Sequence, residues 1–262
     1  MDKKASTAKN HTARVAESFG ARASDYVASA VHAHGPDLEF LRSLLREQTR
    51  KAMLDIGCGG GHVSYLAAGL GHAVTAYDVS GDMLEAVRRT ARQRGMSGIE
   101  TRQGEAESLP FADASFPLVA SRYSAHHWRD FALALREAFR VLEPGGLAVF
   151  MDVIAPGLPL LDTHLQCVEL LRDTSHVRDY SAGEWLSALG GAGFAVREVR
   201  SFRLRLEFAS WTERMGTPEP FRTAIRGLQE GAASDVRGYF AIEQDGSFSV
   251  DTLTIAAGKP CV

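Results

Sequence analysis

Short apolar runs alternate with longer amphipathic segments along the first 157 residues of the chain. The apolar runs predict strands, and the segments between them predict helices with one apolar face. Strands are expected over residues 53–56, 73–77, 99–102, 116–121 and 147–151. Helices are expected over residues 36–47, 61–70 and 131–142 and directly after Ser80. This alternation indicates βαβ units, so we expect a parallel sheet that is buried on both faces.

The pattern changes after Pro159. An apolar stripe from Leu161 to Leu171 predicts a helix, and Ser181 followed by Glu184 is the sequence of a capping box that begins another. Residues 202–208 and 248–256 are expected to be strands, and residues 212–238 to be mainly helical. We therefore expect an antiparallel hairpin at the edge of the sheet. A small helical cap, over roughly 158–193 and 209–240, is expected to enclose a pocket for a small molecule.

A glycine-rich loop follows the first predicted strand. The chain runs Leu54-Asp55-Ile56-Gly57-Cys58-Gly59-Gly60-Gly61, and Asp78 follows the second predicted strand. Glycines let a nucleotide approach the backbone closely, and a carboxylate roughly 20 residues later reaches ribose hydroxyls. A dinucleotide fingerprint needs a further glycine at position 62, where this chain has His62. The loop therefore predicts a nucleotide-containing cofactor and disfavours a dinucleotide.

Composition excludes several classes of partner. The chain has 262 residues, of which 45% are hydrophobic and 23% charged, as is usual for a globular enzyme. The net charge is -3 and there is no basic run, so no nucleic acid is expected. The three cysteines are widely spaced, and no motif for a metal site is present. Because no signal peptide or spanning apolar run is found, we expect a reduced cytoplasmic protein without membrane insertion. The oligomeric state stays open.

Three motifs together resemble the class I S-adenosylmethionine (SAM) methyltransferases. They lie at residues 54–61, 104–111 and 141–146, and Asp78 completes them. Within that family the chain resembles the methyltransferase type 11 group, which includes the ubiquinone/menaquinone-biosynthesis C-methyltransferases. Residues 171–178, with Glu184 and Trp185, are similar to an uncharacterised bacterial branch of that group. The resemblance implies an α/β, Rossmann-like, doubly wound sheet of seven strands in the order 3-2-1-4-5-7-6, with strand 7 antiparallel. It also implies an N-terminal helical lid (1–48), a SAM-binding core (49–157), and cap helices with edge strands (158–262).

The resemblance carries roles over to single residues. Asp55, Gly57 and Gly59 match the motif that holds the methionyl end of SAM, and Asp78 matches the acid that binds the ribose. Glu105 and Ala106 match the pair beside the adenine, although the family usually has Asp at position 105. In the predicted lid, Tyr26 matches a tyrosine that bonds the SAM carboxylate. The remaining cofactor contacts are expected at Cys58, Val79, Met83, Ser121 and Arg122.

Two adjacent histidines follow the fourth predicted strand, where ligands bind in doubly wound folds. Imidazole titrates near neutral pH, so His126 and His127 are the candidate general bases or substrate contacts. The alternative is that one of them only packs or caps the next helix. Asp152, at the end of the fifth predicted strand, is a weaker candidate.

The function expected from these residues is SAM-dependent methyl transfer to a small-molecule acceptor by SN2 attack, with release of S-adenosylhomocysteine. Two alternatives stay open: a non-catalytic SAM-binding protein on the same fold, and a nicotinamide-dependent dehydrogenase, which His62 disfavours. The sequence does not identify the acceptor or the atom that is methylated.

Overall fold

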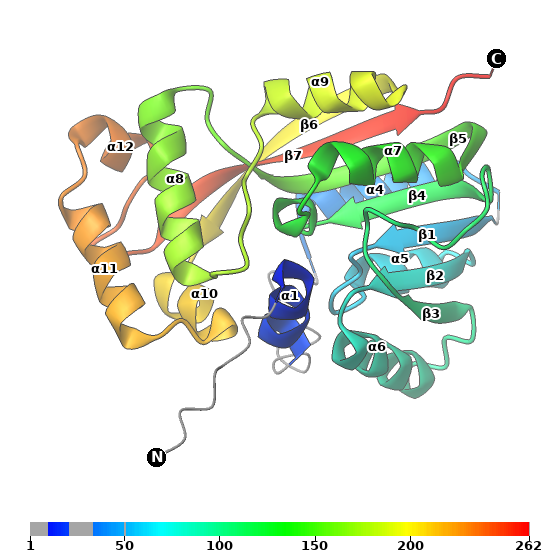
Figure 1. Cartoon of the computed structure of the whole chain (residues 1–262), viewed down its shortest axis with the longest axis horizontal. Helices are drawn as coiled ribbons and strands as arrows, with labels where there is room; N and C mark the ends of the chain where they lie inside the picture. Colours follow the sequence, from blue (N-terminus) through cyan, green and yellow to red (C-terminus); the bar gives the residue numbers. More distant parts are fainter. Residues whose placement is uncertain (1–9, 21–33, 50, 262) are drawn as a thin grey trace.

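The computed structural model describes residues 10–20, 34–49 and 51–261, and their strands form one mixed sheet (Figure 1). The strand order is β3-β2-β1-β4-β5-β7-β6, with β7 antiparallel to both of its neighbours, as the sequence predicted. The strands are β1 (Ala52–Ile56), β2 (Ala73–Asp78), β3 (Ile99–Gln103), β4 (Phe116–Arg122), β5 (Leu142–Ile154), β6 (Ala195–Leu206) and β7 (Phe248–Gly258).

Helices cover both faces of the sheet, because successive side chains on a strand point to opposite faces. On β1, Met53 packs against one layer and Leu54 against the other. The first layer contains α4 (Pro36–Arg46) and α5 (His62–Gly69). On the same side, α6 (Gly81–Gln93) packs with α5 over β2. The second layer contains α7 (Phe131–Val141) and α9 (Ala182–Ala192).

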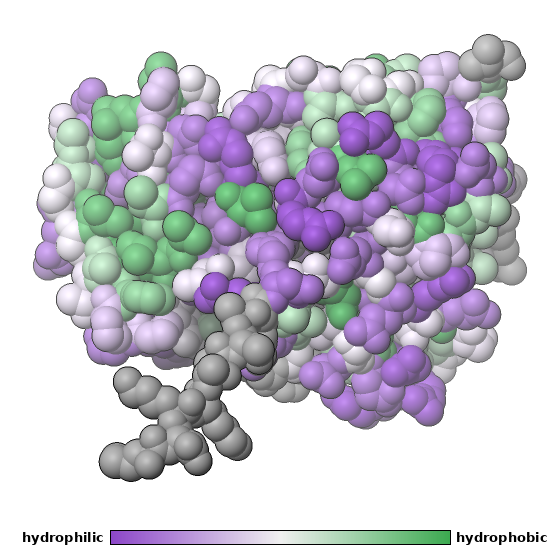
Figure 2. All heavy atoms as spheres, in the orientation of Figure 1, coloured by the Kyte–Doolittle hydropathy of each residue, from purple (hydrophilic) through white to green (hydrophobic). Residues whose placement is uncertain are grey.

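A group of four helices gathers around the far ends of β6 and β7 (Figure 1). Its members are α8 (Pro159–Arg172), α10 (Phe208–Met215), α11 (Glu219–Glu230) and α12 (Ser234–Tyr239). They enclose a separate apolar cluster that includes Leu165, Trp211 and Phe248. Hydrophobic residues also gather on the surface of this cap (Figure 2), where Leu158 and Leu160 are exposed. Within the described residues, no helix combines the length and apolarity that crossing a bilayer requires.

The helix α9 was expected in the cap but lies over the sheet beside α7 (Figure 1). Ser181 and Glu184 form the predicted capping box at its start. The ring of Trp185 then meets that of Phe131 edge-on at a centroid distance of 4.6 Å. The apolar face of α9 is therefore buried by the core, which the capping signal alone could not reveal.

Two strand boundaries also differ from the prediction. β6 begins at Ala195 instead of residue 202, and its first residues are mostly exposed at the edge of the sheet, so they show no apolar alternation. β5 begins at Leu142, directly after α7, and its pairing with β4 shifts register between Phe116 and Leu118. Pro117 lies at that shift and has no N–H to continue the ladder.

We expect Leu54→Ala to lower the free energy of unfolding by about 2–5 kcal/mol, because it opens a cavity between β1 and the α7–α9 layer. The side chain of Leu54 is fully buried. Leu160→Ala removes the same atoms from an exposed position of α8, so its effect should stay within about 0.5 kcal/mol. Urea unfolding at neutral pH measures both changes, and equal losses in the two variants would contradict the described packing.

Candidate active site

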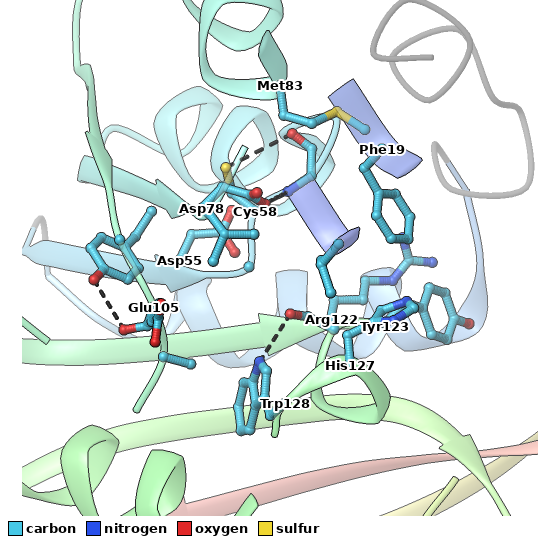
Figure 3. A pocket seen from close by; sticks show the side chains of 18 of the residues that line it. Phe19, Asp55, Cys58, Asp78, Met83, Glu105, Arg122, Tyr123, His127 and Trp128 are labelled. Atoms are coloured by element: carbon cyan, nitrogen blue, oxygen red, sulfur yellow. Dashed lines mark hydrogen bonds between the residues drawn. The ribbon is translucent and has the colours of Figure 1, made fainter. Parts of the chain in front are cut away.

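A cavity opens at the carboxyl ends of β1, β2 and β4, where the strand order reverses between β1 and β4. Ligands bind at such switch points in doubly wound sheets. The cavity has an empty volume of about 1030 Å³ (Figure 3). We call it the first cavity. Among its lining residues are Asp55, Gly57, Cys58, Gly59, Asp78, Val79, Met83, Glu105, Ala106, Arg122, Tyr123, His127 and Trp128.

The glycine loop after β1 is held against the end of β2. Gly57 has a φ of +67°, and a Cβ there would lie 1.8 Å from Ser124 Oγ, so no other residue fits without a rearrangement. The N–H of Gly59 donates to Asp78 Oδ2 at 2.9 Å, and the N–H of Ser80 donates to Asp78 Oδ1 at 2.8 Å. One carboxylate therefore joins the loop after β1 to the start of α6.

Two buried carboxyl groups give the first cavity its charge. Burial, with a smaller contribution from the Asp78 carboxylate, raises the pKa of Asp55 to about 7, although the hydrogen bond that Ser64 Oγ donates to Asp55 Oδ2 at 2.6 Å lowers it. Burial also raises the pKa of Asp78. Such groups ionise more readily when a positive charge lies nearby. The cavity therefore suits a ligand that carries cationic groups.

Most of the predicted cofactor contacts lie together in this cavity. Glu105 lies 4.0 Å from Arg129 Nη2, and Ala106 beside it is buried. Arg122 forms a buried ion pair with Asp37 at 2.5 Å. Ser121 is not among the lining residues, because it follows the alternation of β4 and is buried on the face opposite Arg122. Tyr26 lies outside the described residues.

The helix α1 (His11–Gly20) contributes His11, Thr12, Val15 and Phe19 to the lining of the first cavity, and it lies between the cap and α6 (Figure 1). The ring of Phe19 meets that of His127 edge-on at a centroid distance of 4.9 Å. His11 Nε2 donates to the carbonyl oxygen of His127 at 2.9 Å, and Arg14 donates to Thr174 Oγ1 at 3.1 Å. This part of the predicted lid therefore contacts both the core and the segment that follows α8.

A second cavity, with an empty volume of about 570 Å³, lies between the core and the cap. It shares Phe19, Tyr123 and His127 with the first cavity. We call it the second cavity. Its apolar residues are Val153, Leu204, Leu206 and Trp211, and its other polar residues are His126, Glu169, Arg172, Asp179 and Arg214. The two cavities therefore meet at one aromatic junction.

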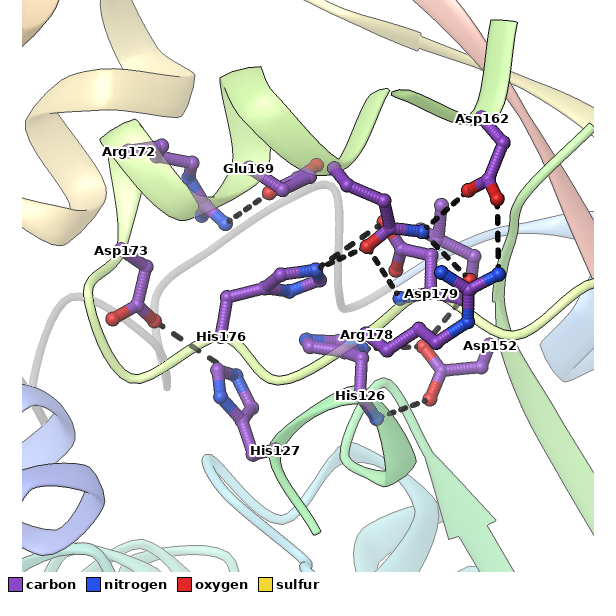
Figure 4. Close-up of polar contacts among 12 residues, drawn as sticks. His126, His127, Asp152, Asp162, Glu169, Arg172, Asp173, His176, Arg178 and Asp179 are labelled. Atoms are coloured by element: carbon purple, nitrogen blue, oxygen red, sulfur yellow. Dashed lines mark hydrogen bonds and ion pairs between the residues drawn. The ribbon is translucent and has the colours of Figure 1, made fainter. Parts of the chain in front are cut away.

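His126 is a charged imidazole at neutral pH. Its Nδ1 lies 2.6 Å from Asp152 Oδ1, and the Asp152 side chain is buried (Figure 4). Burial lowers the pKa of His126, but the Asp152 carboxylate outweighs burial and the net pKa is raised to about 9. Asp152 and His126, both candidate site residues in the sequence, are therefore in direct contact.

His127, in contrast, is a neutral imidazole at neutral pH. Burial and the neighbouring charge of His126 lower the pKa of His127 to about 4. Its Nδ1 lies 3.0 Å from the carbonyl oxygen of Ser175, which only accepts, so the proton is on Nδ1. The adjacent histidines thus divide into one charged and one neutral imidazole, and only the neutral one lines both cavities.

Several site residues carried no signal in the sequence. Tyr123 lines both cavities and has a φ of +52°, which is uncommon for a residue other than glycine. Asp37, the partner of Arg122, comes from α4, and Asp179 comes from the segment before α9. Each becomes part of the site only because distant segments of the chain meet there.

Comparison with known proteins decides the family. The model of a methyltransferase domain family matches residues 54–150. YafE, an uncharacterized protein of Escherichia coli K12, is 50% identical over 203 residues, which cover 78% of this chain and 98% of that protein. The uncharacterized methyltransferase YcgJ of Bacillus subtilis is 33% identical over 224 residues, covering 86% and 88%. The chain belongs to this methyltransferase family.

Structural comparison supports the same assignment. The crystal structure of YcgJ superimposes with a TM-score of 0.82 and 31% identity, covering 87% of this chain and 99% of YcgJ. A demethylmenaquinone methyltransferase of Lactococcus lactis is 32% identical over 162 residues, covering 59% of this chain and 64% of that protein. The predicted family and fold are confirmed, and the cofactor of this methyltransferase is SAM. The first cavity fits SAM, because its buried acids complement the sulfonium and ammonium charges.

We expect Asp78→Ala to weaken binding of S-adenosylhomocysteine at least tenfold, because it removes the acid of the first cavity that holds the glycine loop in place. Asp113→Asn, at an exposed position, should leave the dissociation constant unchanged. Isothermal titration calorimetry measures both. Equal affinity in the two variants would show that Asp78 does not hold the cofactor or its loop.

The charge on His126 should make stability depend on pH. The pKa of His126 is raised from 6.5 to about 9 in the folded protein, so this group contributes stability below about pH 6.5 and loses it as the pH rises through about 9. Asp152→Asn removes the cause of the rise. The difference in unfolding free energy between wild type and Asp152→Asn should therefore shrink from pH 6.5 to 9. A constant difference, or an NMR-measured pKa of His126 that Asp152→Asn leaves near 9, would contradict the ion pair.

Proposed function

We propose that the protein transfers the methyl group of SAM to a small organic acceptor in the second cavity, by direct SN2 attack. The observation that carries this proposal is the junction at Phe19, Tyr123 and His127, where the two cavities meet. SAM supplies an electrophilic methyl group when bound, and S-adenosylhomocysteine is released after transfer.

The residues of the site would act mainly by alignment. Asp55, Asp78 and Glu105 would hold the donor in the first cavity, and the apolar residues of the second cavity would hold the acceptor opposite it. Alignment of two reactants in a near-attack geometry supplies on the order of 7–11 kcal/mol. The neutral His127 would lie where the methyl group is transferred. The charged His126, which lines only the second cavity, would contact the acceptor but not the donor.

A relative supports a small-molecule acceptor. The Lactococcus lactis protein named demethylmenaquinone methyltransferase is similar to more than half of this chain. The rival dehydrogenase is disfavoured because His62 begins α5 where a dinucleotide fingerprint needs its last glycine. A non-catalytic SAM-binding protein would not need a second cavity that contains a partly buried, ion-paired histidine.

The proposal is tested by incubating the protein with metabolite extracts and isotopically methyl-labelled SAM, followed by mass analysis. We expect a labelled product of low molecular mass from wild type and from Asp113→Asn, and at least a tenfold loss of product with Asp78→Ala. His127→Ala should also reduce product formation, because it removes the ring that both cavities share.

Two outcomes would count against the proposal. Binding of S-adenosylhomocysteine without any labelled product would favour the non-catalytic alternative. Tight binding of NAD without binding of S-adenosylhomocysteine would favour the dehydrogenase.

A further inference from the structure

Residues 173–178 connect α8 to α9 and have no role in the proposed transfer. We call them the α8–α9 segment. They fall within residues 171–178, the stretch that resembles an uncharacterised branch of the family. Among the described residues that line the first and second cavities, none belongs to this segment. The α8–α9 segment can therefore act on the site only through the residues that it contacts.

The α8–α9 segment contacts both histidines that follow β4. The N–H of Val177 donates to the carbonyl oxygen of His126 at 2.8 Å. His127 Nδ1 donates to the carbonyl oxygen of Ser175 at 3.0 Å. Ser175 is fully buried, so its carbonyl oxygen has no access to bulk water. The segment therefore fixes the backbone of His126 and the ring of His127.

Asp173 fixes this arrangement from within the segment. Its Oδ1 accepts hydrogen bonds from the N–H of Ser175 at 2.8 Å and from Ser175 Oγ at 2.7 Å. Its Oδ2 forms no hydrogen bond within the described part of the chain and lies 3.8 Å from His127 Nε2 (Figure 4). The Asp173 side chain is 3% exposed. Both nitrogens of His127 are therefore directed at the α8–α9 segment.

His127 in turn holds α1. His11 Nε2 donates to the carbonyl oxygen of His127 at 2.9 Å, and the ring of Phe19 meets the His127 ring edge-on at 4.9 Å. Arg14 adds a direct contact with the α8–α9 segment, because its Nη2 donates to Thr174 Oγ1 at 3.1 Å. These contacts involve residues from the first turn to the last turn of α1, so they fix the whole helix.

The position of α1 determines the shape of the first cavity. Four residues of the helix line that cavity: His11, Thr12, Val15 and Phe19. Phe19 also packs with Met83 of α6, which lines the same cavity. A shift of α1 would therefore change the surface that is available to the methyl donor.

We propose that Asp173 is a positioning residue for the methyl donor. It fixes Ser175, Ser175 fixes the ring of His127, and His127 holds α1 against the first cavity. In this arrangement His127 acts by holding α1, and not as a base that takes a proton from the acceptor, since both of its nitrogens are directed at the α8–α9 segment. The inference concerns binding of the donor and goes beyond the proposed transfer, on which it does not depend.

Isothermal titration calorimetry of the protein with S-adenosylhomocysteine tests these contacts. We expect Asp173→Ala to weaken binding about tenfold, because Ser175 loses both of its bonds to residue 173. Asp245→Ala is the matched control. Asp245 accepts the same two bonds from the N–H and Oγ of Ser247, at 2.9 and 3.0 Å, in the loop before β7. This variant should stay within about twofold of wild type.

Two further variants show whether Asp173 acts through His127. Asp173→Asn keeps an oxygen for Ser175, and its N–H can donate to Nε2 of the neutral His127, so it should bind within about threefold of wild type. Asp173→Ala combined with His127→Ala should bind no more than about twofold more weakly than His127→Ala alone. If Asp173 contributed only to general stability, its loss would have the same effect in either background.

Arg14→Ala makes the test independent of folding. Arg14 is exposed and lines neither cavity, so its truncation leaves the core intact. We expect S-adenosylhomocysteine to bind about threefold more weakly, because α1 loses its direct contact with the α8–α9 segment. Arg88→Ala removes an equivalent exposed bond, from Arg88 Nη1 to Thr101 Oγ1 at 2.9 Å, and should not change the affinity. Circular dichroism confirms that the other variants are folded.

Four results would overturn the inference: unchanged affinity in Asp173→Ala and Arg14→Ala, equal losses in Asp173→Ala and Asp245→Ala, a tenfold loss in Asp173→Asn, or additive losses in the double variant. If Asp173→Ala does not fold, unchanged affinity in Arg14→Ala overturns the inference by itself. Failure of the proposed function appears differently, as binding of S-adenosylhomocysteine by wild type without any labelled product.

Discussion

The hydrogen bonds that Asp78 accepts determine the geometry of the cofactor site. Asp78 ends β2, yet its two carboxylate oxygens bind the N–H groups of Gly59, in the loop after β1, and of Ser80, which caps α6. The loop after β1, the end of β2 and the start of α6 are thereby held together by one buried carboxylate. The glycine loop can take this path because Gly57 has a positive φ and no Cβ that would clash with Ser124.

The chemistry of the second cavity depends on the protonation states of His126 and His127, which burial and neighbouring charges determine. Two adjacent histidines with the same intrinsic pKa end in opposite protonation states, because Asp152 contacts His126, whereas His127 faces a carbonyl oxygen and the charge of His126. Pairs of titratable groups with separated pKa values are typical of active sites.

The prediction from sequence succeeded where the physical signal is local. The strands β1, β2 and β4 are short apolar runs, and Ser80 and Ser181 are caps whose partners lie within one turn. It failed where packing by distant segments decides the outcome. The first half of β6 is an exposed edge strand without alternation, and α9 has a cap signal but no signal for the face that buries it. Ser121, predicted to bind the cofactor, is buried and is not among the residues that line the first cavity, because side chains alternate along β4.

The sequence by itself determined the fold class, the family and the cofactor, because the glycine loop and Asp78 are joined by one short βαβ unit whose geometry is nearly constant. Only the tertiary structure decided which residues meet in the second cavity, the proposed acceptor site. Its residues His126, Asp152, Asp179, Leu204 and Trp211 come from separate elements that meet between the core and the cap. Their charge states depend on burial and on contacts across long sequence separations, and neither quantity can be read from residue order.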